Sequence, residues 1–378
     1  MDPHDKLTMR ATRALAAAAL AMLPGLAAAQ SSVQIFGIID AGVLAQNKSP
    51  GGDSLTRVET SGLRQSVWGF KGTEDLGNGL KAFFNLESHF DTDTGALHPS
   101  GDSPGSGTIL FRRQANVGLS GDWGSITIGR QYGPALLAHI GTEPRAMKEQ
   151  FSNLYAWAYN QYEAIAGPDA LNSDNDVGIF MKNSIQYRNT FGPVSLGVLY
   201  AFGEQEGAFS DNNSIVALGA SYTGPVVVSG SYEYMKDQKT GNKNIEHTGL
   251  GFALPYRNFT FKANWLRAEN SGADGVRTSK VDAWGVGTDW KWSDSNSATL
   301  AYYDNKDKEH GSNQTRNVVL SNDYFISKRT TLYAQMAVVD ADDGAVGAAA
   351  LKTSIVADGS FEAGKTTTFV NLGINHTF

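Results

Sequence analysis

The 378-residue sequence contains no cysteine, so a scaffold held together by disulfide bonds is excluded. Charged residues make up only 18% of it, and the 38 acidic residues outnumber the 31 basic ones to give a formal net charge of -7. This negative balance argues against a nucleic-acid partner held mainly by phosphate contacts. The hydrophobic fraction of 41% is too low for a bundle of membrane-spanning helices and too high for a disordered chain.

The first 29 residues differ in composition from the rest of the chain. Three basic residues precede an apolar run over 14–26, and three alanines then lead up to Gln30. This order is typical of a secretory signal peptide. An uncleaved membrane anchor is the alternative, but the apolar run is shorter than the ~18 residues that a helical span needs. We therefore expect residues 1–29 to be removed on export and residues 30–378 to form the mature protein.

Beyond the first 29 residues no run of ~18 apolar residues occurs, and an alternation of apolar and polar residues takes its place. Val370, Leu372 and Ile374, for example, are separated by Asn371 and Gly373. Every second side chain of a β-strand faces the same side, so each such window predicts a strand with one apolar and one polar face. We find about sixteen windows, at 33–45, 64–74, 79–91, 111–121, 124–131, 182–190, 193–203, 214–223, 226–236, 245–256, 258–269, 280–292, 296–305, 315–326, 329–340 and 366–378.

The connections between these windows alternate between short turns and long polar loops. Turn-forming residues fill short connections such as 75–78 and 121–124, whereas the longest connection spans 132–178. Transmembrane barrels have short turns on the periplasmic side and long loops outside, so the sequence predicts an all-β protein, an antiparallel transmembrane β-barrel of about 16 strands. A soluble β-sandwich is the alternative, but a sandwich does not explain so many strands of bilayer height.

Several of these segments resemble the Gram-negative general porins, a family of trimeric outer-membrane diffusion channels. The resemblance rests on GFKGTEDLGNGLKA at 69–82, on GINHTF at 373–378, and on the segments 33–42, 113–121 and 128–133. It covers the mature chain and is closest to the porins of Neisseria-like and Burkholderia-like bacteria. It implies a water-filled channel in the cell outer membrane for passive diffusion of small hydrophilic solutes and ions.

The same resemblance implies partners and a constriction. The partners are two further copies in a homotrimer, outer-membrane lipid and lipopolysaccharide, and the barrel-assembly machinery, which reads the last aromatic residue of the final strand, here Phe378. The connection 132–178 corresponds to a third loop that folds into the barrel and sets acidic groups opposite a basic wall. A transverse field of this kind favours small polar solutes over apolar ones.

Basic residues on the polar faces of the strands are the candidates for this wall. Alternation points Arg112 into the lumen, whereas the register of the resembled family favours Arg113. Arg130 also fits an ion pair at a subunit contact, because its neighbours on the strand are apolar. Two positions that are often basic in the family are here Val67 and Phe180, so we expect fewer basic residues in this wall than the family pattern implies. The full set of pore-lining candidates is Lys71, Lys81, Arg112, Arg113, Arg130, Lys182 and Lys262 with the loop acids Glu143, Glu149 and Glu163.

Aromatic residues in the long loop leave two functions open. They are able to stack on sugars or small organic acids, which would make the channel substrate-selective, or to pack the loop against the wall of a general diffusion porin. Ion selectivity is open in the same way, and we expect a weak preference for anions because the local field outweighs net charge. The aromatic residues are Phe151, Tyr155, Trp157, Tyr159 and Tyr162.

An enzymatic role is a further alternative, because some outer-membrane barrels are hydrolases. None of the seven histidines lies in a recognisable catalytic or metal-binding motif, and no phosphate-binding loop follows a strand into a helix. We therefore expect no catalytic residues, no metal and no cofactor.

Overall fold

The computed structural model describes residues 32–97, 109–146, 148–158, 172–176, 179–204, 206, 211–311, 313–343, 361 and 363–378. The expected signal peptide lies outside these residues, and so do the candidate acid Glu163 and the aromatic residues Tyr159 and Tyr162. Within them, 18 strands form one sheet, and two short helices follow β6. The elements are β1 (Ser32–Gln46), β2 (Leu55–Thr60), β3 (Val67–Gly77), β4 (Leu80–His89), β5 (Gln114–Gly121), β6 (Gly124–Tyr132), α2 (Pro134–Ala138), α3 (Asn153–Ala158), β7 (Asn175–Asp176), β8 (Phe180–Phe191), β9 (Val194–Ala201), β10 (Ile215–Thr223), β11 (Val227–Lys236), β12 (Lys243–Tyr256), β13 (Phe259–Ser271), β14 (Arg277–Ser293), β15 (Asn296–Asp307), β16 (Gln314–Phe325), β17 (Thr330–Ala341) and β18 (Thr366–Thr377).

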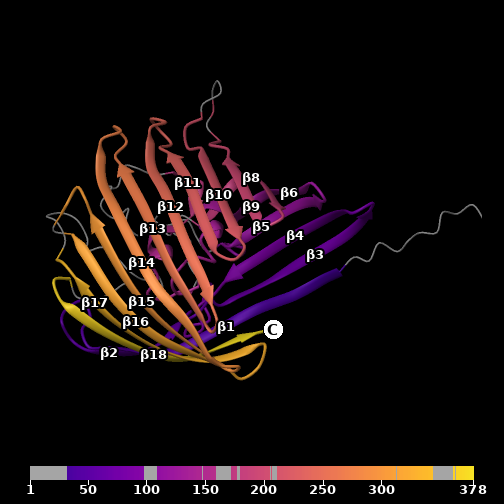
Figure 1. Cartoon of the computed structure of the whole chain (residues 1–378). Helices are drawn as coiled ribbons and strands as arrows, with labels where there is room; N and C mark the ends of the chain where they lie inside the picture. Colours follow the sequence, from indigo (N-terminus) through magenta and orange to yellow (C-terminus); the bar gives the residue numbers. More distant parts are fainter. Residues whose placement is uncertain are drawn as a thin grey trace, which may run out of the picture.

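The sheet closes on itself into a barrel (Figure 1). Strands β2 and β7 are short additions, and the other 16 of the 18 strands pair antiparallel with their neighbours in chain order. The ring is completed because β1 pairs with β18 over Ile38–Gln46 and with β3 over Ser32–Ile38. The predicted antiparallel barrel is therefore confirmed.

The alternating pattern sorts side chains between the two faces of the barrel wall. On β18, Val370, Leu372 and Ile374 are exposed on the outer face, whereas Asn371 and Asn375 are buried on the inner face. Large apolar side chains are exposed in the same way along the other barrel strands. An outer face of this kind matches the apolar band that a transmembrane barrel presents to lipid.

Each predicted window overlaps one barrel strand, with ends that agree to within about three residues. The sequence interpretation missed β2, β7, α2 and α3, which lie in connections predicted to be loops. β2 pairs only with the Ala41–Gln46 half of β1, and neither described helix exceeds six residues. Elements this short contain too few residues for a period to show. Neither helix is long and apolar enough to cross a membrane.

Asp40 of β1 ties the connection between β2 and β3 to the inner face of the wall. Its buried carboxylate accepts backbone N–H bonds from Gly62 at 2.8 Å and from Leu63 and Arg64 at 3.1 Å. It also accepts 2.8 Å bonds from the Tyr333 hydroxyl and the Asn375 amide. Five donors thus converge on one carboxylate, which joins β1, β17, β18 and the connection at one point.

Candidate functional site

Residues 133–146 and 148–158, which belong to the connection between β6 and β8, contact the inner face of the wall. α2 packs on β9, β10 and β11. Its first residue, Pro134, lies so close to Gly219 of β10 that a Cβ atom at residue 219 would overlap the Pro134 carbonyl oxygen. Glycine is needed at this position for the close approach of the two backbones.

His139, just after α2, fixes the connection to β11. Its Nδ1 and Nε2 atoms each lie 2.8 Å from a serine hydroxyl, that of Ser229 and that of Ser231, and its ring meets Trp157 edge-on. Burial lowers the pKa of His139 to about 4, because the charged imidazolium loses its hydration. The contacts therefore hold the neutral ring.

Acidification is expected to weaken the attachment of His139 to β11. Because the pKa of His139 in the folded protein lies below its ordinary value of 6.5, the unfolded chain binds more protons, and stability falls as the pH drops from 6.5 towards 4. The full effect is about 3 kcal/mol and is absent at neutral pH. Heat stability in detergent, measured between about pH 4.5 and 7.5, should fall more steeply with acid for the wild type than for His139→Asn, which does not titrate. Equal slopes would contradict the prediction.

Arg145 and Lys148 attach the middle of the connection to β15, β16 and β17. The Lys148 Nζ atom lies 2.9 Å from both the Asp323 carboxylate and the Thr299 hydroxyl, and Arg145 donates to the Gln335 side chain. Burial lowers the pKa of both basic groups, and the Asp323 carboxylate opposes the shift at Lys148. In this part of the connection, basic loop residues meet an acidic wall residue, which is the reverse of the arrangement that the family resemblance implies.

The two described candidate acids of the connection are buried. The Glu143 carboxylate accepts bonds from the Tyr303 hydroxyl at 2.5 Å and the Ser152 hydroxyl at 3.0 Å. Glu149 is 2% exposed, and its backbone N–H donates to the Leu63 carbonyl at 2.9 Å. Both acids thus lie in the packed part of the connection rather than at an open surface.

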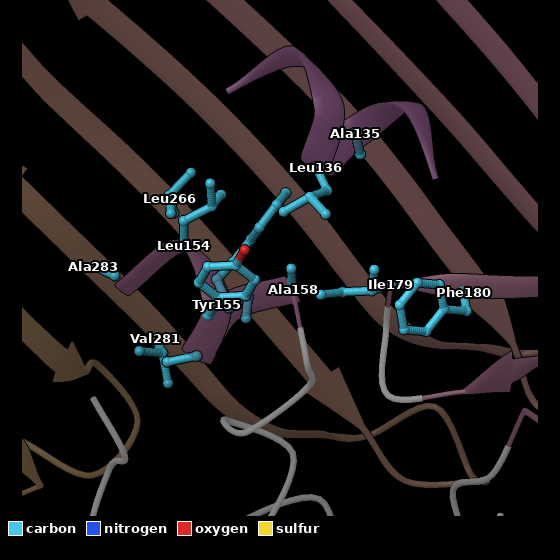
Figure 2. Packing of buried hydrophobic residues seen from close by; sticks show 13 residues of the cluster. Ala135, Leu136, Leu154, Tyr155, Ala158, Ile179, Phe180, Leu266, Val281 and Ala283 are labelled. Atoms are coloured by element: carbon cyan, nitrogen blue, oxygen red, sulfur yellow. The ribbon is translucent and has the colours of Figure 1, made fainter. Parts of the chain in front are cut away.

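The described aromatic residues of the connection pack against the wall. In Figure 2, Leu154 and Tyr155 of α3 lie beside Leu266 of β13 and Val281 of β14. Trp157 is fully buried, and its indole N–H donates to the Arg267 carbonyl at 2.9 Å. These side chains have no surface left on which a solute can stack, so their burial supports the packing interpretation.

Three of the candidate lysines lie on the inner face of their strands. Lys71 of β3 is exposed, with its Nζ atom 5.0 Å from the centre of the Phe36 ring. Lys81 of β4 is also exposed and lies next to the short turn between β3 and β4. Lys262 of β13 is 8% exposed, and its Nζ atom forms a 2.6 Å ion pair with Asp289.

The two candidate arginines before β5 differ in their contacts. The Arg113 guanidinium pairs with the Glu87 carboxylate on the inner face of β4 and donates to the Tyr132 hydroxyl. It also lies over the Tyr132 and Phe180 rings, at 5.5 and 5.2 Å from their centres. Arg112 is 4% exposed, and its carbonyl accepts a bond from the Arg130 Nε atom.

Arg130 and Lys182 line a groove on the outer wall. The groove has a volume of about 740 Å³ and is mainly apolar, with Ile128 and Phe202 among its lining residues. Ile128 is exposed on the outer face of β6, and Arg130 follows it two positions along the same strand. In the described part of the chain, neither base is among the residues that line the interior cavities.

A cavity of about 570 Å³ opens on the inner face of β3, β4, β5, β6 and β8. Its charged lining residues within the described chain are Lys71 and Arg188, and the lining contains no carboxylate. A second cavity of about 430 Å³ shares Arg188 with the first and continues along β8, β9 and β10. The polar lining of the first cavity otherwise consists of hydroxyl and carboxamide groups, those of Ser32, Gln34, Thr73, Asn85, Gln114, Asn116, Ser125, Thr127, Gln131, Tyr132 and Gln186.

Arg188 is a lining residue that the sequence interpretation missed. It alternates on β8 with Ser184 and Gln186, on the face opposite Ile185 and Tyr187, so the period-two pattern was sufficient to place it inside. On β8 the only candidate was Lys182, which lies two residues after Phe180, a position that is often basic in the resembled family. Alternation alone was the better guide at Arg188.

Comparison with known proteins gives one consistent result. The family model described as Gram-negative porin matches residues 14–344. Outer membrane porin protein 32 of Delftia acidovorans is 30% identical over 97% of this chain and 99% of its own length. The solved structure of an anion-selective porin from Comamonas acidovorans has a TM-score of 0.76 and 28% identity, and covers 92% of this chain and 100% of that one. OmpT of Vibrio cholerae, solved in a trimer form, has a TM-score of 0.64 at 13% identity over 92% of this chain and 99% of that one, and shows the fold alone.

Proposed function

This chain belongs to the Gram-negative porin family, so its barrel forms a water-filled diffusion channel in the outer membrane, and we propose that the channel prefers small anions over cations. The observation that carries the proposal is the lining of the two interior cavities, where Lys71 and Arg188 face no carboxylate among the described lining residues. Fixed charges nearest the path of an ion decide its selectivity more strongly than charges spread over the whole surface. The net charge of -7 is therefore compatible with an anion preference.

A third cavity near the short turns supports the same sign of selectivity. Its volume is about 600 Å³, and its basic lining residues outnumber the acidic ones. The similarity to a structure titled an anion-selective porin, at 28% identity over its full length, points in the same direction. The charged residues that line the third cavity are Arg64, Lys148, Lys328 and Arg329 with Asp294 and Asp323.

Reversal potentials in planar bilayers test the proposal. With KCl more concentrated on one side, an anion-preferring channel gives a potential of the sign set by chloride flow. Lys71→Gln and Arg188→Gln should each move this potential towards the cation side, because each removes one positive charge from the cavity lining. A wild-type potential of the sign set by potassium would refute the anion preference.

The pore wall that we infer for this chain consists of Lys71, Lys81, Arg113, Lys262 and the newly recognised Arg188. The connection after β6 is assigned as the constricting third loop, supported by its contacts with inner-face side chains from β10 to β17. Burial of the described loop aromatics favours general diffusion over a channel that selects solutes with these side chains. The matched family consists of channel proteins, and we propose no catalytic activity and no cofactor for this member.

The assembly proposed here follows the family resemblance. Residues 1–29 are removed on export, the barrel-assembly machinery recognises the C-terminal strand, and the barrel forms a homotrimer among outer-membrane lipid and lipopolysaccharide. Phe378 exchanges backbone hydrogen bonds with Gly37 at the junction of the first and last strands, so the terminal residue lies where the barrel closes. The groove with Arg130 and Lys182 is a candidate contact surface on the outer wall.

A further inference from the structure

Two bases of the first interior cavity differ from Lys262 and Arg113 of the inner face. Lys262 pairs with Asp289 and Arg113 pairs with Glu87, so their charges are neutralised by neighbouring carboxylates. Lys71 and Arg188 are both exposed, and neither forms an ion pair within the part of the chain that the structure describes. Their charge is therefore available to a solute.

The surface between these two bases is built from uncharged polar groups. Strand register places Asn85 beside Lys71 and Asn116 beside Asn85, while Ser125 pairs with Arg188. Carboxamides and hydroxyls both donate and accept hydrogen bonds, so they suit the hydroxyl and carbonyl groups of a small organic molecule.

The same cavity also has apolar surface and a suitable size. The rings of Phe83 and Tyr132 are among its lining residues, and they offer contact to a carbon skeleton. Its volume of about 570 Å³ falls within the range of small-molecule pockets. Charge, hydrogen-bonding groups and apolar surface thus occur together on one side of the channel.

We propose that this cavity is a binding station for small organic carboxylates, with Arg188 and Lys71 as the specificity-determining residues. The planar guanidinium of Arg188 matches the two oxygens of a carboxylate, and the Lys71 ammonium adds a second charge. The inference rests on the proposed anion preference and goes beyond it. A positive field alone speeds the passage of every anion, whereas a binding station becomes saturated.

Block of single-channel current by succinate tests the station, with neutral succinamide and inorganic phosphate as comparison solutes. In wild-type channels in planar bilayers, succinate should reduce the KCl current saturably, succinamide should have no effect, and phosphate should block less well. Arg188→Gln and Lys71→Gln should each raise the half-blocking succinate concentration about tenfold, as expected for the loss of one charged hydrogen bond. Arg188→Lys keeps the positive charge but loses the planar guanidinium group, so it should raise the half-blocking succinate concentration by a smaller factor.

Lys182→Gln is the matched control, because Lys182 lies on the same strand as Arg188 but lines the groove on the outer wall. Its half-blocking concentration should equal that of the wild type. Three results would contradict the proposed station. The first is a wild type that succinate does not block. The second is a half-blocking succinate concentration in Arg188→Gln and Lys71→Gln equal to that of the control. The third is a block of the wild type by phosphate as strong as the block by succinate. Reversal potentials on the same membranes separate the two proposals, because an anion-preferring wild type without saturable block refutes the station alone.

Discussion

Asp40→Ala is expected to lower the stability of the folded barrel by roughly 4 kcal/mol and to release the connection between β2 and β3 from the wall. The change leaves three backbone N–H groups, the Tyr333 hydroxyl and the Asn375 amide without their shared acceptor. Buried donors that lose an acceptor cost more than the bond itself contributed, because water does not replace it.

The loss should also reach the connection after β6. The Gly62 carbonyl accepts a hydrogen bond from the backbone N–H of Gln150, and the Leu63 carbonyl accepts one from that of Glu149. The segment between β2 and β3 that Asp40 holds in place therefore also holds the connection after β6. We expect a larger and noisier single-channel current in Asp40→Ala, together with a lower unfolding temperature in detergent. Asp122→Ala is the control, because Asp122 is an exposed residue of the turn between β5 and β6 and is not among the residues that line the three interior cavities described above. A variant with wild-type heat stability and current would contradict the role given to Asp40.

The barrel was predictable from the sequence because its main signal is local. In each strand, apolar and polar residues alternate along the sequence, which reveals the outer and the inner face. The alternation is clear around Phe259 and Phe261 of β13. Lipid outside and water inside impose the same rule on all strands of the ring. This repetition is why the strand windows agree with the structure.

The interior was less predictable, because it depends on contacts between residues far apart in the chain. Nothing near Asp40 in the sequence indicates partners at Tyr333 and Asn375, and nothing near Lys148 indicates Asp323. Alternation places a residue inside but does not say whether a neighbouring carboxylate neutralises it. This is why Lys262 and Lys71, both inner-face lysines, have different surroundings.

The connection after β6 also explains the small residues of the inner wall. Gly219, Gly249 and Gly251 lie where Pro134, His139 and Thr142 approach the strands most closely. On an isolated strand, glycine at an inner-face position weakens the sheet. Here the glycines leave room for the connection after β6 to lie close against the wall, so the sequence of the strands matches the packing of this connection.

Gly219→Ala is therefore expected to displace α2 and change the channel, although it adds a single methyl group. The new Cβ would overlap the Pro134 carbonyl oxygen, and a backbone atom on a packed helix has little freedom to move away. Overpacking of this kind costs about 1–3 kcal/mol. Pro134, Leu137 and Ala138 line the second interior cavity together with Arg188, so a shift of α2 should alter both conductance and ion selectivity.

Gly230→Ala provides a close comparison. Gly230 lies on β11, next to β10, and pairs with Ala220, the residue that follows Gly219 and faces the opposite side of the wall. A Cβ atom there would meet the Leu250 side chain at 3.7 Å, an ordinary contact distance. Single-channel conductance and reversal potential should change in Gly219→Ala and stay at wild-type values in Gly230→Ala. Equal values in the two variants would mean that the contact between Pro134 and Gly219 does not position α2, because a displaced helix changes the cavity that it lines.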